Sequence, residues 1–154
     1  MTCGHVDIIE RAARVFDEVV VAIGVNMEKQ PFFTLEERVD FLHKAVGHLA
    51  NVQVDYFSGL LVEYVGRADA RVIIKGLRAV SDFEVELQMA LTNKRLNESV
   101  ETLFMVPSGE HSFLSSSLVR ELAEFNASLT GLVPDCVIEA FNKKYQVKRQ
   151  EAKT

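Results

Sequence analysis

The stretch Val19-Val20-Val21-Ala22-Ile23-Gly24-Val25 decides the fold of this chain. It is almost entirely apolar and rich in β-branched residues, a composition that favours a strand over a helix. Its apolar residues are consecutive rather than alternating, so both faces of the strand are expected to be buried. Strands covered on both faces are typical of parallel sheets that carry helices above and below.

Helical and extended patterns alternate on both sides of this strand. Strands are expected at 19–25, 52–56, 71–75 and 101–106, and helices at 7–16, 34–49, 61–65, 81–96, 115–125 and 134–141. This order predicts an α/β protein with a Rossmann-like, doubly wound parallel sheet. We assign residues 1–142 to a single domain and residues 143–154 to a charged C-terminal tail.

Composition and charge narrow the class of protein. The 154 residues are 48% hydrophobic and 25% charged, which is typical of one globular domain. The formal net charge of -5 argues against nucleic acid or an anionic membrane as the main partner. No membrane-spanning apolar run and no secretory signal pattern is found, so we expect a soluble cytoplasmic protein. The two cysteines form no metal-ligand pair and are expected to be small apolar fillers.

Four loops are expected at the sheet edge where parallel strands end, which is where ligands bind in such folds. They carry His5 at the start of the first helix, Lys29 after the first strand, and Lys75 and Arg78 around a glycine. The fourth loop begins a helix with the run Ser115-Ser116-Ser117. Cations, a glycine and the unpaired N–H groups of helix starts together favour a phosphate-binding site.

A purely structural role is open for each of these residues. His5 could flank a helix start, Lys29 could be a solvated lysine, and Arg78 could pair with Asp82. One serine could serve only as a helix cap. Glu86 is an ordinary surface carboxylate unless a site lies beside it, and no histidine has metal-ligand spacing, so no metal site is predicted. The loops together indicate transfer of a phosphate-containing group by positioning and charge stabilisation, without a covalent intermediate.

Four stretches then match a known family. In their order and spacing, Thr2–Asp7, Thr34–Arg38, Lys75–Glu84 and Ser112–Arg120 resemble bacterial phosphopantetheine adenylyltransferase. The first and last are similar to the (H/T)xGH and ISSTxxR motifs of the wider nucleotidyltransferase superfamily. The resemblance runs from Thr2 to about residue 141, and the third stretch is particular to this family.

The resemblance implies a reaction of coenzyme A biosynthesis. The phosphate of 4′-phosphopantetheine would attack the α-phosphorus of ATP, giving dephospho-coenzyme A and pyrophosphate. Mg²⁺ would accompany ATP, and coenzyme A is a candidate inhibitor. Members of the family assemble as hexamers, which implies a homohexamer here.

Roles for individual residues also follow from the resemblance. His5 would stabilise the α-phosphate in the transition state, and Lys29 would hold phosphates of both substrates. Lys75 would bind the phosphate of phosphopantetheine, and Leu60 and Leu61 would line the site of its pantetheine arm.

The nucleotide side of the site is implied in the same way. Arg78 would contact the phosphates of ATP, which makes it a catalytic residue together with His5 and Lys29. Glu86 would lie at the ribose or phosphate region. Leu114 and Ser115–Ser117 would bind adenine and the β- and γ-phosphates.

The beginning of the chain departs from the family pattern. The family has a strand and a Gly-[ST]-Phe-Asp-Pro segment just before the (H/T)xGH turn, whereas Met1 stands there in this sequence. That strand would be the central one of the sheet, so its neighbours at 19–25 and 72–75 would each lack a ladder partner. We expect a chain without it to be poorly soluble or unstable and nearly inactive.

Two other interpretations stay open. One is another adenylyl- or cytidylyltransferase of the superfamily, which the Lys75–Glu84 run disfavours. The other is an N-terminally truncated protein that binds nucleotide or coenzyme A but is weakly active or inactive. Release of pyrophosphate from ATP and phosphopantetheine separates the enzymes from such a binding protein.

An upstream coding stretch is expected in the reading frame before Met1. We expect Met1 to be encoded by a valine codon that was read as an initiator, with the missing strand and Phe-Asp-Pro segment encoded in frame before it. Translation of the DNA upstream of Met1 tests this. An immediate in-frame stop codon would contradict it.

Overall fold

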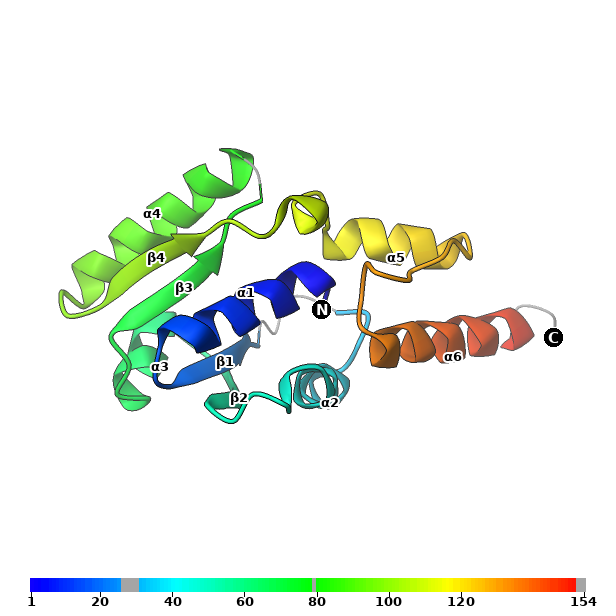
Figure 1. Cartoon of the computed structure of the whole chain (residues 1–154), viewed down its shortest axis with the longest axis horizontal. Helices are drawn as coiled ribbons and strands as arrows, with labels where there is room; N and C mark the ends of the chain where they lie inside the picture. Colours follow the sequence, from blue (N-terminus) through cyan, green and yellow to red (C-terminus); the bar gives the residue numbers. More distant parts are fainter. Residues whose placement is uncertain (26–30, 79, 152–154) are drawn as a thin grey trace.

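Helices and parallel strands alternate along the chain in the order that the sequence predicts (Figure 1). The computed structural model describes residues 1–25, 31–78 and 80–151. The strands are β1 Val19–Gly24, β2 Val52–Phe57, β3 Val72–Gly76 and β4 Glu101–Met105. The helices are α1 Cys3–Val15, α2 Leu35–Val46, α3 Leu61–Arg67, α4 Val80–Leu96, α5 Ser116–Glu124 and α6 Asp135–Glu151, with a 3₁₀ turn, η1, at Gly109–His111. The predicted α/β class is confirmed.

The described strands form two parallel pairs rather than one continuous sheet. β1 pairs with β2, with Val19 opposite Val52. β3 pairs with β4, with Val72 opposite Glu101. Among these four strands, β1 and β3 share no ladder, so each of them uses only one of its two hydrogen-bonding edges. Among the described residues, contacts other than a shared strand connect the two pairs.

Helix α1 lies against both strand pairs. In Figure 1 it runs in front of β1, with β3 and β4 to one side, and it contacts both β1 and β3. Its Ile9 packs with Ile23 of β1 in a buried cluster. Its Ile8 lies so close to Gly76 that a Cβ added there would be 2.5 Å from the Ile8 Cδ1 atom. Gly76 thus allows the helix to approach the end of β3.

Hydrogen bonds hold α1 at its C-terminal end and along its length. At its C-terminal end, the Asn51 Nδ2 donates to the carbonyl oxygens of Ala13 at 2.8 Å and Phe16 at 3.0 Å. On the other strand pair, the Arg11 Nη1 donates to a carbonyl just after β4, Val106 O, at 2.7 Å. The Asp7 carboxylate accepts from the amide of Ser108 at 3.0 Å. Asn51 precedes β2, so α1 is bonded to both strand pairs.

A separate aromatic cluster joins the end of the chain to α2. Phe33 and Phe41 are buried with Phe141 of α6, and the Phe33 and Phe141 ring centroids are 4.8 Å apart. The segment from residue 143, which the sequence sets apart as a charged tail, continues α6 as far as residue 151. Within it, the Lys144 Nζ donates to the carboxylate of Glu37 at 2.7 Å.

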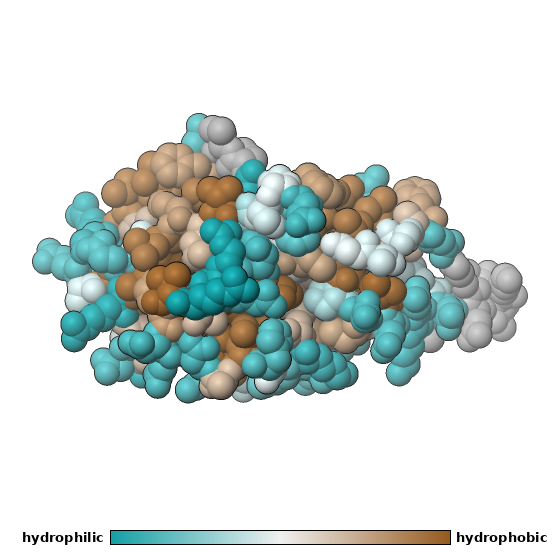
Figure 2. Space-filling model, viewed as in Figure 1, coloured by the Kyte–Doolittle hydropathy of each residue, from teal (hydrophilic) through white to brown (hydrophobic). Residues whose placement is uncertain are grey.

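Apolar side chains remain exposed on α4 and β4. They include Phe83 (41% exposed), Val85 (61%), Met89 (45%) and Leu91 (64%) of the helix. Figure 2 shows hydrophobic residues gathered on this part of the surface, to one side of the polar residues at the centre of the view. In the described part of the chain, no helix has both the length and the apolar composition needed to cross a membrane.

Candidate active site

The first turn of α1 fixes the orientation of His5. Thr2 is the N-cap residue, and His5 stands at the third helical position, where a capping box usually has Glu or Gln. The Thr2 amide donates to the His5 Nδ1 at 3.1 Å, and the Thr2 hydroxyl lies 2.8 Å from the same nitrogen. Because Nδ1 accepts from an N–H group, the neutral ring carries its proton on Nε2. His5 therefore offers an Nε2–H donor.

The surroundings keep His5 neutral. Burial, the N-terminal amino group and the Arg78 guanidinium lower the pKa of the imidazole to about 4. The residue keeps access to solvent, whereas Nδ1 is enclosed by the backbone and hydroxyl of Thr2. At neutral pH His5 is thus a hydrogen-bond donor and not a cation, which decides between the two roles open to a histidine at a phosphate site.

Arg78 links three of the elements that border the site. It follows β3, and its Nε donates to Asp82 Oδ2 of α4 at 3.0 Å. Its Nη2 lies 3.3 Å from the other Asp82 oxygen. Its Nη1 donates to the carbonyl oxygen of Leu114, just before α5, at 2.7 Å. The predicted pairing with Asp82 is present, and the same guanidinium also joins two of the predicted site loops.

Lys75 and Glu86 form a second ion pair beside the first. The Lys75 Nζ lies 3.1 Å from Glu86 Oε2, and the two side chains are only 30% and 27% exposed. Two residues that were predicted to bind different substrates therefore meet directly. Glu86 is an ion-pair partner in the site and not an isolated surface carboxylate.

The serine run at the start of α5 divides into two roles. Ser115 is the N-cap residue, and its Oγ accepts from the amide of Leu118 at 3.1 Å. Ser116 and Ser117 instead line a cavity of about 610 Å³. The side chain of Leu114 is buried, with 1% of the residue exposed. Its carbonyl oxygen contacts the site by accepting a hydrogen bond from Arg78.

The cavity lies between the beginning of α1 and the beginning of α5. Its lining includes Met1 and Thr2, the two arginines Arg38 and Arg120, and the aromatic residues Phe32, Phe33 and Phe141. Neither arginine was among the predicted site residues. The sequence held a signal for Arg120, which stands four residues after Ser116 and so on the same face of the helix. Arg38 follows the capping box of α2. That pattern predicts the start of a helix and gives no sign of a binding role for Arg38.

Three other predicted residues stand apart from this description. Lys29 lies outside the described residues. Leu60 is the exposed N-cap of α3, and Leu61 packs against the buried cluster of Val65, Ile73 and Val100. Within the described ranges, no three His, Cys, Asp or Glu side chains gather in a way that could hold a metal ion.

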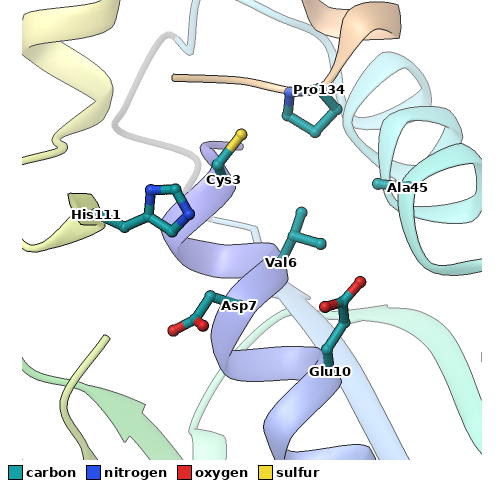
Figure 3. Close-up of a pocket in the computed structure, with 7 residues that line it drawn as sticks. All are labelled: Cys3, Val6, Asp7, Glu10, Ala45, His111 and Pro134. Carbon is teal, nitrogen blue, oxygen red and sulfur yellow. The ribbon is translucent and has the colours of Figure 1, made fainter. Parts of the chain in front are cut away.

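A smaller hollow of about 260 Å³ lies along α1 (Figure 3). Cys3, Asp7 and Glu10 border it from the helix, and His111 borders it from η1. Burial raises the pKa of the Cys3 thiol, and Asp7 already accepts from the Ser108 amide. The hollow contains none of the predicted site residues, so we separate it from the candidate site.

Comparisons with known proteins identify the family of the chain. Residues 1–122 match the model of the cytidylyltransferase-like family. Phosphopantetheine adenylyltransferase of Dictyoglomus turgidum is 51% identical over 148 residues, which cover 96% of this chain and 92% of the relative. The enzyme of that name from Heliobacterium modesticaldum is 51% identical over 145 residues, 94% of this chain and 86% of the relative. That of Dictyoglomus thermophilum is 49% identical over 148 residues, 96% and 90% of the two chains.

The fold and the site thus define a nucleotidyltransferase of the cytidylyltransferase-like class. Since identity of about half extends over nearly the whole chain, it belongs to the phosphopantetheine adenylyltransferase family. The resemblance in the four sequence stretches is confirmed by these matches.

The low pKa of His5 predicts a measurable dependence of stability on pH. The folded-state pKa of about 4 lies below the ordinary histidine value of 6.5, so the unfolded chain binds more protons between these values. The free energy of unfolding should therefore fall as the pH is lowered from about 6.5 toward about 4. Urea unfolding across this range should show a steeper fall for the wild type than for His5→Gln, which keeps a capping-box side chain but does not titrate. Equal slopes for the two proteins would contradict the prediction.

Proposed function

We propose that this chain transfers the adenylyl group of ATP to 4′-phosphopantetheine, releasing pyrophosphate and forming dephospho-coenzyme A. The observation that carries the proposal is the pairing of an oriented Nε2–H donor on His5 with a cavity bordered by the start of α5. The names of relatives about half identical over nearly the whole chain support the choice of substrates.

The cavity suits the phosphates of a nucleotide. Ser116 and Ser117 offer hydroxyl groups, and the first turn of α5 offers backbone N–H groups aligned with the helix dipole. Arg38 of α2 and Arg120 of α5 add positive charge to the lining. In this arrangement the β- and γ-phosphates lie at the start of α5, and the α-phosphate lies toward His5.

The transfer is a single displacement at phosphorus. A phosphate oxygen of the acceptor forms a bond to the α-phosphorus, and the bond from that phosphorus to the α,β-bridging oxygen breaks, so that pyrophosphate leaves with the electron pair. The Nε2–H of His5 donates to the α-phosphate as negative charge builds on its oxygens. Arg78, held by Asp82 and Leu114, adds positive charge, and Lys75 and Lys29 bind the acceptor phosphate.

Mg²⁺ would enter with ATP. The described lining of the cavity offers serine hydroxyls and arginines but no carboxylate, which does not suit a cage made only by protein. Mg²⁺ commonly binds substrate phosphates and keeps several waters, and the serine hydroxyls fit that mode. The ion would neutralise phosphate charge, and the protein's own part would be to position the phosphates.

The activity and the role of His5 are tested together. Purified chain should release pyrophosphate from ATP and 4′-phosphopantetheine. His5→Ala should lower kcat by about 10²–10³-fold, because one donor to the transition state is lost. Its affinity for ATP should change little, since the donor acts chiefly as charge develops on the α-phosphate.

Two results would count against this assignment. Equal losses in kcat and in ATP affinity would place His5 in ground-state binding instead. Binding of ATP without pyrophosphate release by the wild type would identify a protein that only binds nucleotide. His43→Ala is the matched control, because His43 is an exposed histidine of α2 outside the site.

We also propose that the chain works in the cytoplasm as a homohexamer. The exposed apolar residues of α4 support self-assembly, because a single helix that is apolar on several sides normally has a covering partner. Light scattering should give a mass six times that of the 17.3 kDa chain. Leu91→Lys should reduce that mass, whereas Val15→Lys, an exposed apolar residue at the end of α1, should not. A monomeric wild type would contradict the proposal.

A further inference from the structure

Two carboxylates of α4 face two cations at the end of β3. Asp82 and Glu86 stand one helical turn apart, and they contact Arg78 and Lys75 respectively. Each cation that is offered to a phosphate is therefore already next to an anion of the protein. A bound phosphate must either join these pairs or replace the carboxylates.

The two pairs differ in how firmly they are built. Asp82 accepts from the backbone amide, Nε and Nη2 of Arg78, and Arg78 Nη1 is held by Leu114 O at 2.7 Å. This set of bonds fixes the guanidinium and ties two loops together. Removing Asp82 would therefore disturb structure as well as charge.

The pair of Lys75 and Glu86 has a single contact. Glu86 Oε2 lies 3.1 Å from the Lys75 Nζ, but no hydrogen bond of good geometry reaches this oxygen from the described residues. The oxygen is also shielded from water. A shielded carboxylate oxygen without a good hydrogen bond is costly, so the pair is held by charge alone and is the easier of the two to separate.

We propose that Glu86 is a displaceable internal counterion of Lys75, which occupies the cation until the phosphate of the acceptor substrate replaces it. This rests on the proposed function only in placing the acceptor phosphate at Lys75. A phosphate monoester carries nearly two negative charges at neutral pH, whereas a carboxylate carries one. The exchange therefore favours a phosphorylated acceptor over a singly charged or neutral one, and Glu86 is a residue that sets specificity.

The proposal predicts that removing the competing charge improves binding. Glu86→Gln should bind 4′-phosphopantetheine about threefold to fivefold more tightly than the wild type, which matches the upper range measured for partly exposed ion pairs. Inorganic phosphate should show a change in the same direction. Calorimetric titration without ATP, at physiological ionic strength, measures both affinities.

A matched control separates displacement from a general change of charge. Glu84→Gln removes the same charge from an exposed position on the same helix. It should leave the affinity for 4′-phosphopantetheine within twofold of the wild type, because long-range effects of exposed charges are screened.

A double-mutant cycle locates the competition at Lys75. Lys75→Gln should weaken binding of 4′-phosphopantetheine, and adding Glu86→Gln in that background should bring no gain. An equal affinity of Glu86→Gln and Glu84→Gln, or an undiminished gain without Lys75, would overturn the inference. Because these titrations contain no ATP, they can succeed or fail independently of pyrophosphate release, which tests the proposed function.

Discussion

The contacts of α1 are the constraint on which the rest of the structure depends. The described strands form two pairs that share no ladder, so helices that contact both pairs, α1 among them, hold the pairs in position. Asn51 binds one end of α1 from the β1–β2 side, and Val106 accepts from Arg11 on the β3–β4 side. Since His5 lies in the first turn of the same helix, its distance from the loops after β3 and β4 depends on these bonds.

The site itself is assembled by polar contacts between loops and not by a common core. Arg78 binds Asp82 and the carbonyl of Leu114, so one side chain sets the start of α4 relative to the start of α5. A structural role and a functional role for Arg78 are therefore not alternatives. The bonds that hold the guanidinium also restrict it to one orientation, which lowers the entropy lost when a phosphate binds.

The sequence predicted the order of elements because each has a strong local pattern. The apolar run at 19–25 and the capping box at Thr34 required no knowledge of distant residues, and both elements are present. The predicted loops also met where Arg78 reaches Leu114. Features that depend on tertiary packing were not predicted from the sequence. One is the position of Arg38 beside the cavity, which depends on how α2 lies against the N-terminus. The neutral state of His5 depends on burial and on Arg78, which no spacing rule reports.

The electrostatic arrangement of the site fits a reaction in which charge is redistributed. Cations that are already paired with carboxylates are less costly to enclose than lone cations, and a phosphate that displaces Glu86 from Lys75 replaces one anion with another. Substrate binding then changes the net charge around Lys75 less than binding to a bare cation would. A neutral His5 follows the same logic, because an Nε2–H donor gains most where negative charge increases during the reaction. A permanently charged imidazolium would also attract the ground-state phosphates, and that part of its binding would not lower the barrier.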